Sequence, residues 1–136
     1  MAIATDIDLT QYMQTPEGAR RFRDWAVANP DLWIENILNC SLWTIPKLIA
    51  KAVFTQKQDG STTRVCVPAC ASVGKSHLAA RVALAFFYNF RPCTVITTAP
   101  TMRQVGEILW REIAQAWSMA RFNMGGELKQ TRIDVD

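Results

Sequence analysis

The stretch RVCVPACASVGKSHLAARVALAFFYNF, residues 64–90, decides the fold that the sequence predicts. Its first part, residues 64–68, is a short run rich in β-branched residues that ends at Pro68. Its last part, from Gly74 to about Phe90, places apolar side chains three to four residues apart. The first pattern is typical of a strand and the second of an amphipathic helix. We therefore expect a strand, a loop and a helix in that order.

The connection between this strand and this helix is ACASVGKS, residues 69–76. It ends like the phosphate-binding pattern GxxxxGK[ST], but Ala69 stands where the pattern has its first glycine. In such a loop, backbone N–H groups and the positive end of the helix surround phosphate oxygens. Lys75 would reach the terminal phosphates as the catalytic residue, and the Ser76 hydroxyl would bind Mg²⁺. The expected nucleotide-binding residues are Ala71, Ser72, Val73, Gly74, Lys75 and Ser76.

A plain helix start is the structural alternative for the same loop. Ser72 would then cap the helix, and the Lys75 side chain would be solvated. This alternative leaves Gly74 unexplained, because glycine in a first helical turn costs up to about 1 kcal/mol relative to alanine.

A second strand and helix follow the first pair. Residues 94–98, TVITT, form a β-branched run closed by Ala99 and Pro100, and residues 102–119 have helical spacing. Strand, helix, strand and helix in succession indicate an α/β fold with parallel strands. Residues 128–135 are expected to begin a third strand.

The first 60 residues predict short helices instead. Thr15 with Pro16 is typical of a helix start, and Asn29 with Pro30 ends that helix. Two more apolar-periodic stretches, residues 32–38 and 48–53, precede a polar turn near Gly60.

Composition limits the class of protein. The chain has 136 residues, of which 49% are hydrophobic and 20% charged, as in a globular domain. Its longest apolar run, Val82 to Tyr88, is far shorter than the roughly 20 residues of a membrane span, and the opening residues do not resemble a targeting signal, so we expect an intracellular protein. Residues 1–40 carry six acids against three arginines, whereas the remainder is basic, which suits a phosphate-binding second half.

The four cysteines do not indicate a metal site or a disulfide framework. They form no CxxC pair, and the single histidine, His77, cannot complete a zinc site at the usual spacing. Cys66 and Cys93 fall within apolar runs and are expected to be small buried side chains.

With residues 97–104, TTAPTMRQ, added to the loop, the sequence resembles the large terminase subunit of tailed bacteriophages, the ATP-driven motor that packages DNA into the capsid. The resemblance covers about residues 30–120. It rests on residues 33–38, 42–43, 64–67, 72–80, 95–101, 103–105 and 108–113.

The resemblance implies the chemistry of the site. The fold would be a three-layer P-loop NTPase with a parallel sheet, and the ligands would be ATP and Mg²⁺ held at Lys75 and Ser76. Thr98, Thr101 and Gln104 would couple nucleotide state to DNA. Residues 98–104 have a plainer interpretation, namely a strand end, a proline turn and a helix cap.

The resemblance also implies the cellular setting. The parent protein would bind double-stranded DNA, the portal and the small terminase subunit, in the host cytoplasm and without a membrane. Residues 1–60 would be a helical N-terminal segment, and residues 61–136 the first part of a truncated P-loop ATPase domain.

Three departures from the family pattern matter. Pro46 stands where relatives usually have a glutamine that reads adenine, and Ala69 to Ala71 replace Gly, Arg or His. No apolar run ends in Asp-Glu, the pair that would hold Mg²⁺ and activate water. We therefore expect this chain to bind ATP weakly and to hydrolyse none. Without later strands, its two predicted strands would either pair with each other or leave apolar edges open.

Two other functions remain open at this stage. The first is a helicase-type DNA-stimulated ATPase, in which the TAPT block, residues 98–101, would contact the backbone of single-stranded DNA. The second is a non-enzymatic interaction module with a vestigial loop, which Pro46 and residues 69–71 favour.

Overall fold

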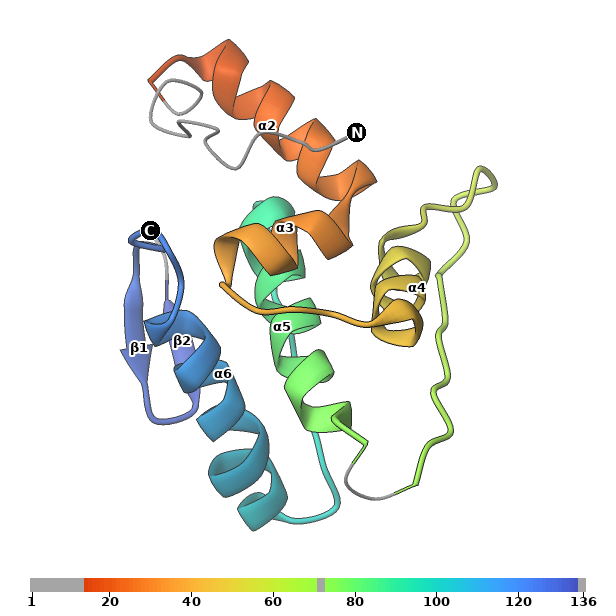
Figure 1. The fold of residues 1–136 in the computed structure, drawn as a ribbon, viewed down its shortest axis with the longest axis vertical. Helices are drawn as coiled ribbons and strands as arrows, with labels where there is room; N and C mark the ends of the chain where they lie inside the picture. The colour runs from red at the N-terminus through yellow and green to blue at the C-terminus, as the bar shows by residue number, and fades with distance from the viewer. Residues whose placement is uncertain (1–13, 71–72, 135–136) are drawn as a thin grey trace.

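The computed structural model describes residues 14–70 and 73–134. Figure 1 shows helix α5 in the middle of the molecule, with α3 across it, α4 on one side and α6 on the other. The described elements, in chain order, are α2 (Pro16–Ala28), α3 (Pro30–Ile37), α4 (Thr44–Phe54), α5 (Lys75–Asn89), the π-helix η1 (Gln104–Leu109), α6 (Trp110–Ser118), β1 (Glu127–Lys129) and β2 (Arg132–Asp134).

The helices that the sequence predicts are confirmed. Thr15 caps α2 by accepting a hydrogen bond from the Gly18 N–H at 3.1 Å, and Pro30 starts the next helix after a break at Asn29. The long apolar stretch after Gly74 forms α5. The stretch predicted over residues 102–119 is helical as well, although its first part is the π-helix η1.

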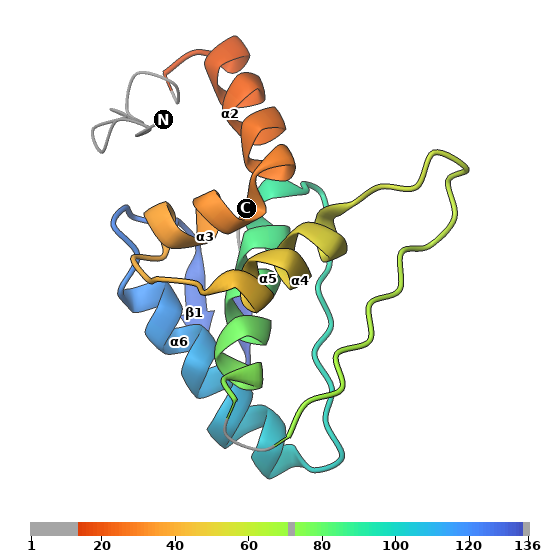
Figure 2. The ribbon, with the colours of Figure 1, turned by 45° about the vertical axis from the view of Figure 1, so that its right-hand side comes forward.

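The predicted three-layer fold with a parallel sheet is wrong for the described residues, which are mostly helical. Their one sheet is the antiparallel hairpin β1–β2, with Leu128 opposite Ile133. Residues 64–68 and 94–98, both predicted as strands, run as open traces without assigned secondary structure (Figure 2). A strand needs hydrogen bonds to a neighbouring strand, and neither segment forms any with another part of the described backbone.

A single hydrophobic core joins the first 60 residues to the rest of the chain. Helix α5 supplies its centre, where Ala80 and Ala85 are fully buried and their small side chains let neighbouring helices approach closely. Phe54 of α4 packs against Phe86 and Phe90 at ring-centroid distances of 5.5 and 5.6 Å. The other buried apolar residues of the core are Ala26, Trp33, Ile34, Ile37, Leu38, Leu42, Ala50, Leu78, Leu84, Ile113 and Ala116.

Two ion pairs hold α4 against α3. Lys47 Nζ lies 3.0 Å from Glu35 Oε2, and Lys51 Nζ lies 3.3 Å from the buried carboxylate of Asp31. Glu35 also accepts a hydrogen bond from the Leu42 backbone N–H at 2.8 Å. The Glu35 side chain therefore fixes the connection between the two helices.

Two further sequence predictions can be compared with the structure. Cys66 is exposed and Cys93 is only half-buried, so the prediction that both are buried is wrong. It failed because the segments that carry them have no packed neighbour on at least one side. None of the helices within residues 14–70 and 73–134 is long and apolar enough to cross a membrane.

Replacement of Leu38 by alanine should lower the free energy of unfolding by about 2–5 kcal/mol. The leucine is 1% exposed, so truncation of its side chain leaves a cavity in the core. Leu48→Ala is the matched control, since that leucine is 59% exposed and its loss should change stability by less than about 0.5 kcal/mol. Urea unfolding followed by circular dichroism measures both. Equal losses in the two variants would contradict the described core.

Candidate functional site

The start of α5 carries the residues that the sequence analysis selected for phosphate binding. Gly74 is the N-cap of α5 and has the left-handed backbone conformation, with φ +78° and ψ 19°. Lys75 is the first residue of the helix, and its exposed ammonium group turns back over the loop, where it donates hydrogen bonds to the carbonyl oxygens of Ala69, at 2.9 Å, and Cys70. Ala71 and Ser72 lie outside the described residues.

Within the described residues, no side chain caps this helix start. The first N–H that α5 bonds internally is that of Leu78, which donates to the Gly74 carbonyl at 3.0 Å. The N–H groups before it therefore have no partner within the helix. Such an end attracts anions through its free donors and through the positive end of the helix dipole.

Gly74 is required here for two independent reasons. Its positive φ disfavours any residue with a side chain, and a Cβ built on it would lie 3.2 Å from Cη2 of Trp43. Trp43 is the N-cap of α4 and is 56% exposed. Its indole therefore lies at the surface, beside the end of the loop. The sequence analysis did not predict this contact, because the two residues are 31 positions apart.

Ser76 and Pro46 bear on which ligands the site could hold. Ser76 is half-buried in the first turn of α5 and offers one hydroxyl oxygen. Within residues 14–70 and 73–134, no group of three or more His, Cys, Asp or Glu residues could hold a metal ion. A single hydroxyl suits Mg²⁺, which keeps several waters and is commonly held through substrate phosphates. Pro46 is buried in the first turn of α4 and supplies no amide group for a nucleobase.

Two of the predicted coupling residues, Thr98 and Thr101, precede η1, and the third, Gln104, is its first residue. Figures 1 and 2 both place this start at the same end of the molecule as the start of α5. Thr101 Oγ1 accepts a hydrogen bond from the Gln104 N–H at 3.3 Å, and Thr98 is exposed. Thr101 thus acts as a helix cap, as the plainer interpretation of residues 98–104 proposes. The π-helix that begins at Gln104 is unusual, because such turns are rare and frequently occur at functional sites.

An ionic cluster missed by the sequence analysis joins the first turns of α5 to α6. Glu112 Oε2 lies 3.4 Å from Nη1 of Arg81 and 3.7 Å from Nδ1 of His77. Arg81 is 4% exposed and also donates to the His77 carbonyl at 2.9 Å. His77 and Arg81 are one helical turn apart in the sequence, but nothing local identifies Glu112 as their partner.

The chain was compared with known protein families, curated proteins and solved structures, and none matches.

Gly74→Ala should destabilise the protein by about 1–2 kcal/mol, because alanine pays for the left-handed conformation and its methyl group presses on Trp43. Gly106→Ala is the control: Gly106 lies within η1 and has open space around its Cβ position, so alanine should be neutral or stabilise by up to about 1 kcal/mol. Urea unfolding of both variants tests this pair. A Gly74→Ala protein as stable as the wild type would contradict the backbone described at the loop.

Burial and the neighbouring Arg81 guanidinium lower the pKa of His77 below its ordinary value of 6.5, against an opposing effect of Glu112. The unfolded chain therefore takes up a proton at a higher pH than the folded chain, and stability should fall as the pH drops below about 6.5. His77→Gln should reduce this fall, which urea unfolding at pH 7.5 and 5.5 measures. An unchanged fall in the variant would contradict the assignment, since His77 is the single histidine of the sequence.

Proposed function

We propose that this chain binds a nucleoside triphosphate at the start of α5, as the ATP-binding part of a large terminase subunit. The observation that carries the proposal is the start of α5, where the N-cap Gly74 has no capping side chain and the Lys75 ammonium turns over the carbonyls of Ala69 and Cys70. A cation beside free N–H donors is a suitable arrangement for phosphate oxygens.

The residues present divide the work of holding the nucleotide. Lys75 would exchange its two carbonyl contacts for phosphate oxygens, and the free N–H groups of the first turn would donate to the same anion. Mg²⁺, when bound with the nucleotide, would neutralise part of the phosphate charge, and Ser76 would hold it through one hydroxyl. Gly74, which has no side chain, would let the loop backbone approach the phosphate oxygens closely.

The larger role is proposed from the resemblance, with support from the placement of two segments. Residues 98–104 lie at the same end of the molecule as the loop (Figure 2). A change in the nucleotide bound at the loop could therefore affect their conformation. In the parent motor these residues would relay that change to double-stranded DNA, with the portal and the small terminase subunit as partners in the host cytoplasm. Hydrolysis would need acidic residues that this chain does not supply.

A non-enzymatic interaction module is the second candidate. The open segments at residues 64–68 and 94–98 favour it, because each leaves backbone groups free for a partner. Pro46 favours it as well, since the buried ring offers nothing to a nucleobase.

Lys75→Ala should weaken the binding of a fluorescent ATP analogue about 10- to 100-fold in the presence of Mg²⁺. This range corresponds to the loss of a hydrogen bond to a charged group, about 1.5–3 kcal/mol. Lys57→Ala is the control, because Lys57 is exposed in the turn after α4 and should not affect binding. Equal affinity in wild type and Lys75→Ala would refute the proposed site. Phosphate release by the wild-type chain would refute the expected lack of hydrolysis.

A further inference from the structure

Residues 93–98 have the alternating burial of a strand but no strand partner within the described residues. Cys93, Val95 and Thr97 are half-buried, whereas the alternate residues are exposed, with Ile96 80% exposed. This alternation is the period of a strand with one covered face. Within the described chain, residues 93–99 form no backbone-to-backbone hydrogen bond. Both edges of a potential strand are therefore free.

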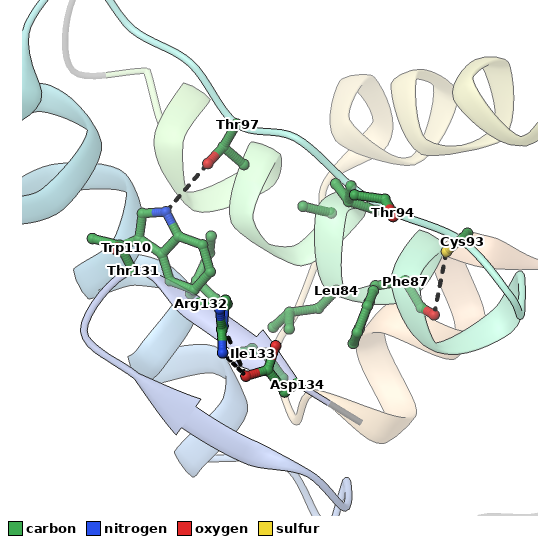
Figure 3. A pocket seen from close by; sticks show the side chains of 13 residues that line it. Leu84, Phe87, Cys93, Thr94, Thr97, Trp110, Thr131, Arg132, Ile133 and Asp134 are labelled. Carbon is green, nitrogen blue, oxygen red and sulfur yellow. Dashed lines mark hydrogen bonds and ion pairs between the residues drawn. The ribbon is translucent and has the colours of Figure 1, made fainter. Parts of the chain in front are cut away.

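A cavity of about 600 Å³ lies along this segment (Figure 3). Leu84 and Phe87 of α5 and Ile113 of α6 line it with apolar surface, and Ile133 of β2 faces it from the opposite side. The Trp110 indole donates a hydrogen bond to Thr97 Oγ1 at 3.2 Å, which holds the segment against α6. The cavity thus has an extended backbone on one side, the strand β2 on the other and two helices beneath.

The occupant that suits this shape is an extended strand. Its backbone could pair with residues 93–98, its apolar side chains could enter the cavity, and it would continue the sheet that β1 and β2 begin. A helix would leave the free N–H and C=O groups of residues 93–98 unpaired.

The same chain also carries an open segment that could form such a strand. Residues 64–68 are all exposed, form no backbone-to-backbone hydrogen bond within the described part of the chain, and lie at the outside of the molecule (Figure 1). Val65 and Val67, 39% and 41% exposed, occupy alternate positions and so lie on one face of the segment. They are the apolar row that such a cavity would accept.

We infer that two copies of this chain pair through these parts, with residues 64–68 of each copy lying along residues 93–98 of the other. Each copy has one strand and one groove, so two reciprocal contacts close a dimer about a two-fold axis. A five-residue strand is about 17 Å long, and two insertions bury on the order of 1,000 Å², the size of a small specific interface. This inference does not depend on nucleotide binding.

The test is the mass of the full chain measured by sedimentation velocity from about 1 to 100 µM. The wild type should change from monomer to dimer over this range. Val67→Asp, which charges the outer strand, and Thr94→Arg, which fills the groove from an exposed position, should each remain monomeric at 100 µM. Met102→Asp is the control, because Met102 is 80% exposed and belongs neither to residues 64–68 nor to residues 93–98. This variant should dimerise like the wild type. Circular dichroism confirms that the variants are folded.

A mixture of the two defective variants makes the test sharper. It should form a heterodimer, because the strand of Thr94→Arg and the groove of Val67→Asp are both intact. Hydrogen exchange at residues 94–97 should also slow as the concentration of the wild type rises. A wild type that is monomeric throughout, or a dimer that persists in both variants, would overturn the inference.

Discussion

The burial of α5 is the constraint on which the rest of the structure depends. Helices α3, α4 and α6 all pack on it, and Leu78, Leu84 and two fully buried alanines provide the surface they share. Burial of this apolar surface is the main favourable term available to a chain of this size. Because the loop ends where α5 begins, the packing that fixes the helix also fixes the direction of its free N–H groups. The candidate site is thus positioned by core residues that never touch a ligand.

The helical part of the fold was predictable because its signals are local. Thr15 with Pro16, the break at Pro30 and the apolar spacing after Gly74 each specify a helix boundary within a few residues. The sheet was not predictable in the same way. Residues 93–98 do have the alternating burial of a strand, but a strand is completed by hydrogen bonds to another segment, and no local pattern states whether that segment is present.

The same distinction between local and non-local signals applies to the candidate site. In the sequence, a plain helix start leaves Gly74 unexplained, and its positive φ in the structure supplies a reason for the glycine. Its second constraint, the Trp43 indole, depends on how α4 lies beside the loop and could not be found by a pattern search. The partnership of Glu112 with His77 and Arg81 is equally non-local. Features that depend on residues adjacent in the sequence could be predicted, such as the glycine at the helix start. Contacts that depend on how distant helices pack could not be predicted.

The open segment and the candidate site are physically continuous, which links the two proposals without making either depend on the other. Residues 64–68 lead directly into Ala69 and Cys70, whose carbonyls accept hydrogen bonds from Lys75. Pairing of this segment with a second copy would restrict the backbone on one side of the loop, as α5 already restricts it on the other. A loop held at both ends has less conformational entropy to lose when it closes on an anion. Association would then favour nucleotide binding, and nucleotide binding would favour association by the same factor.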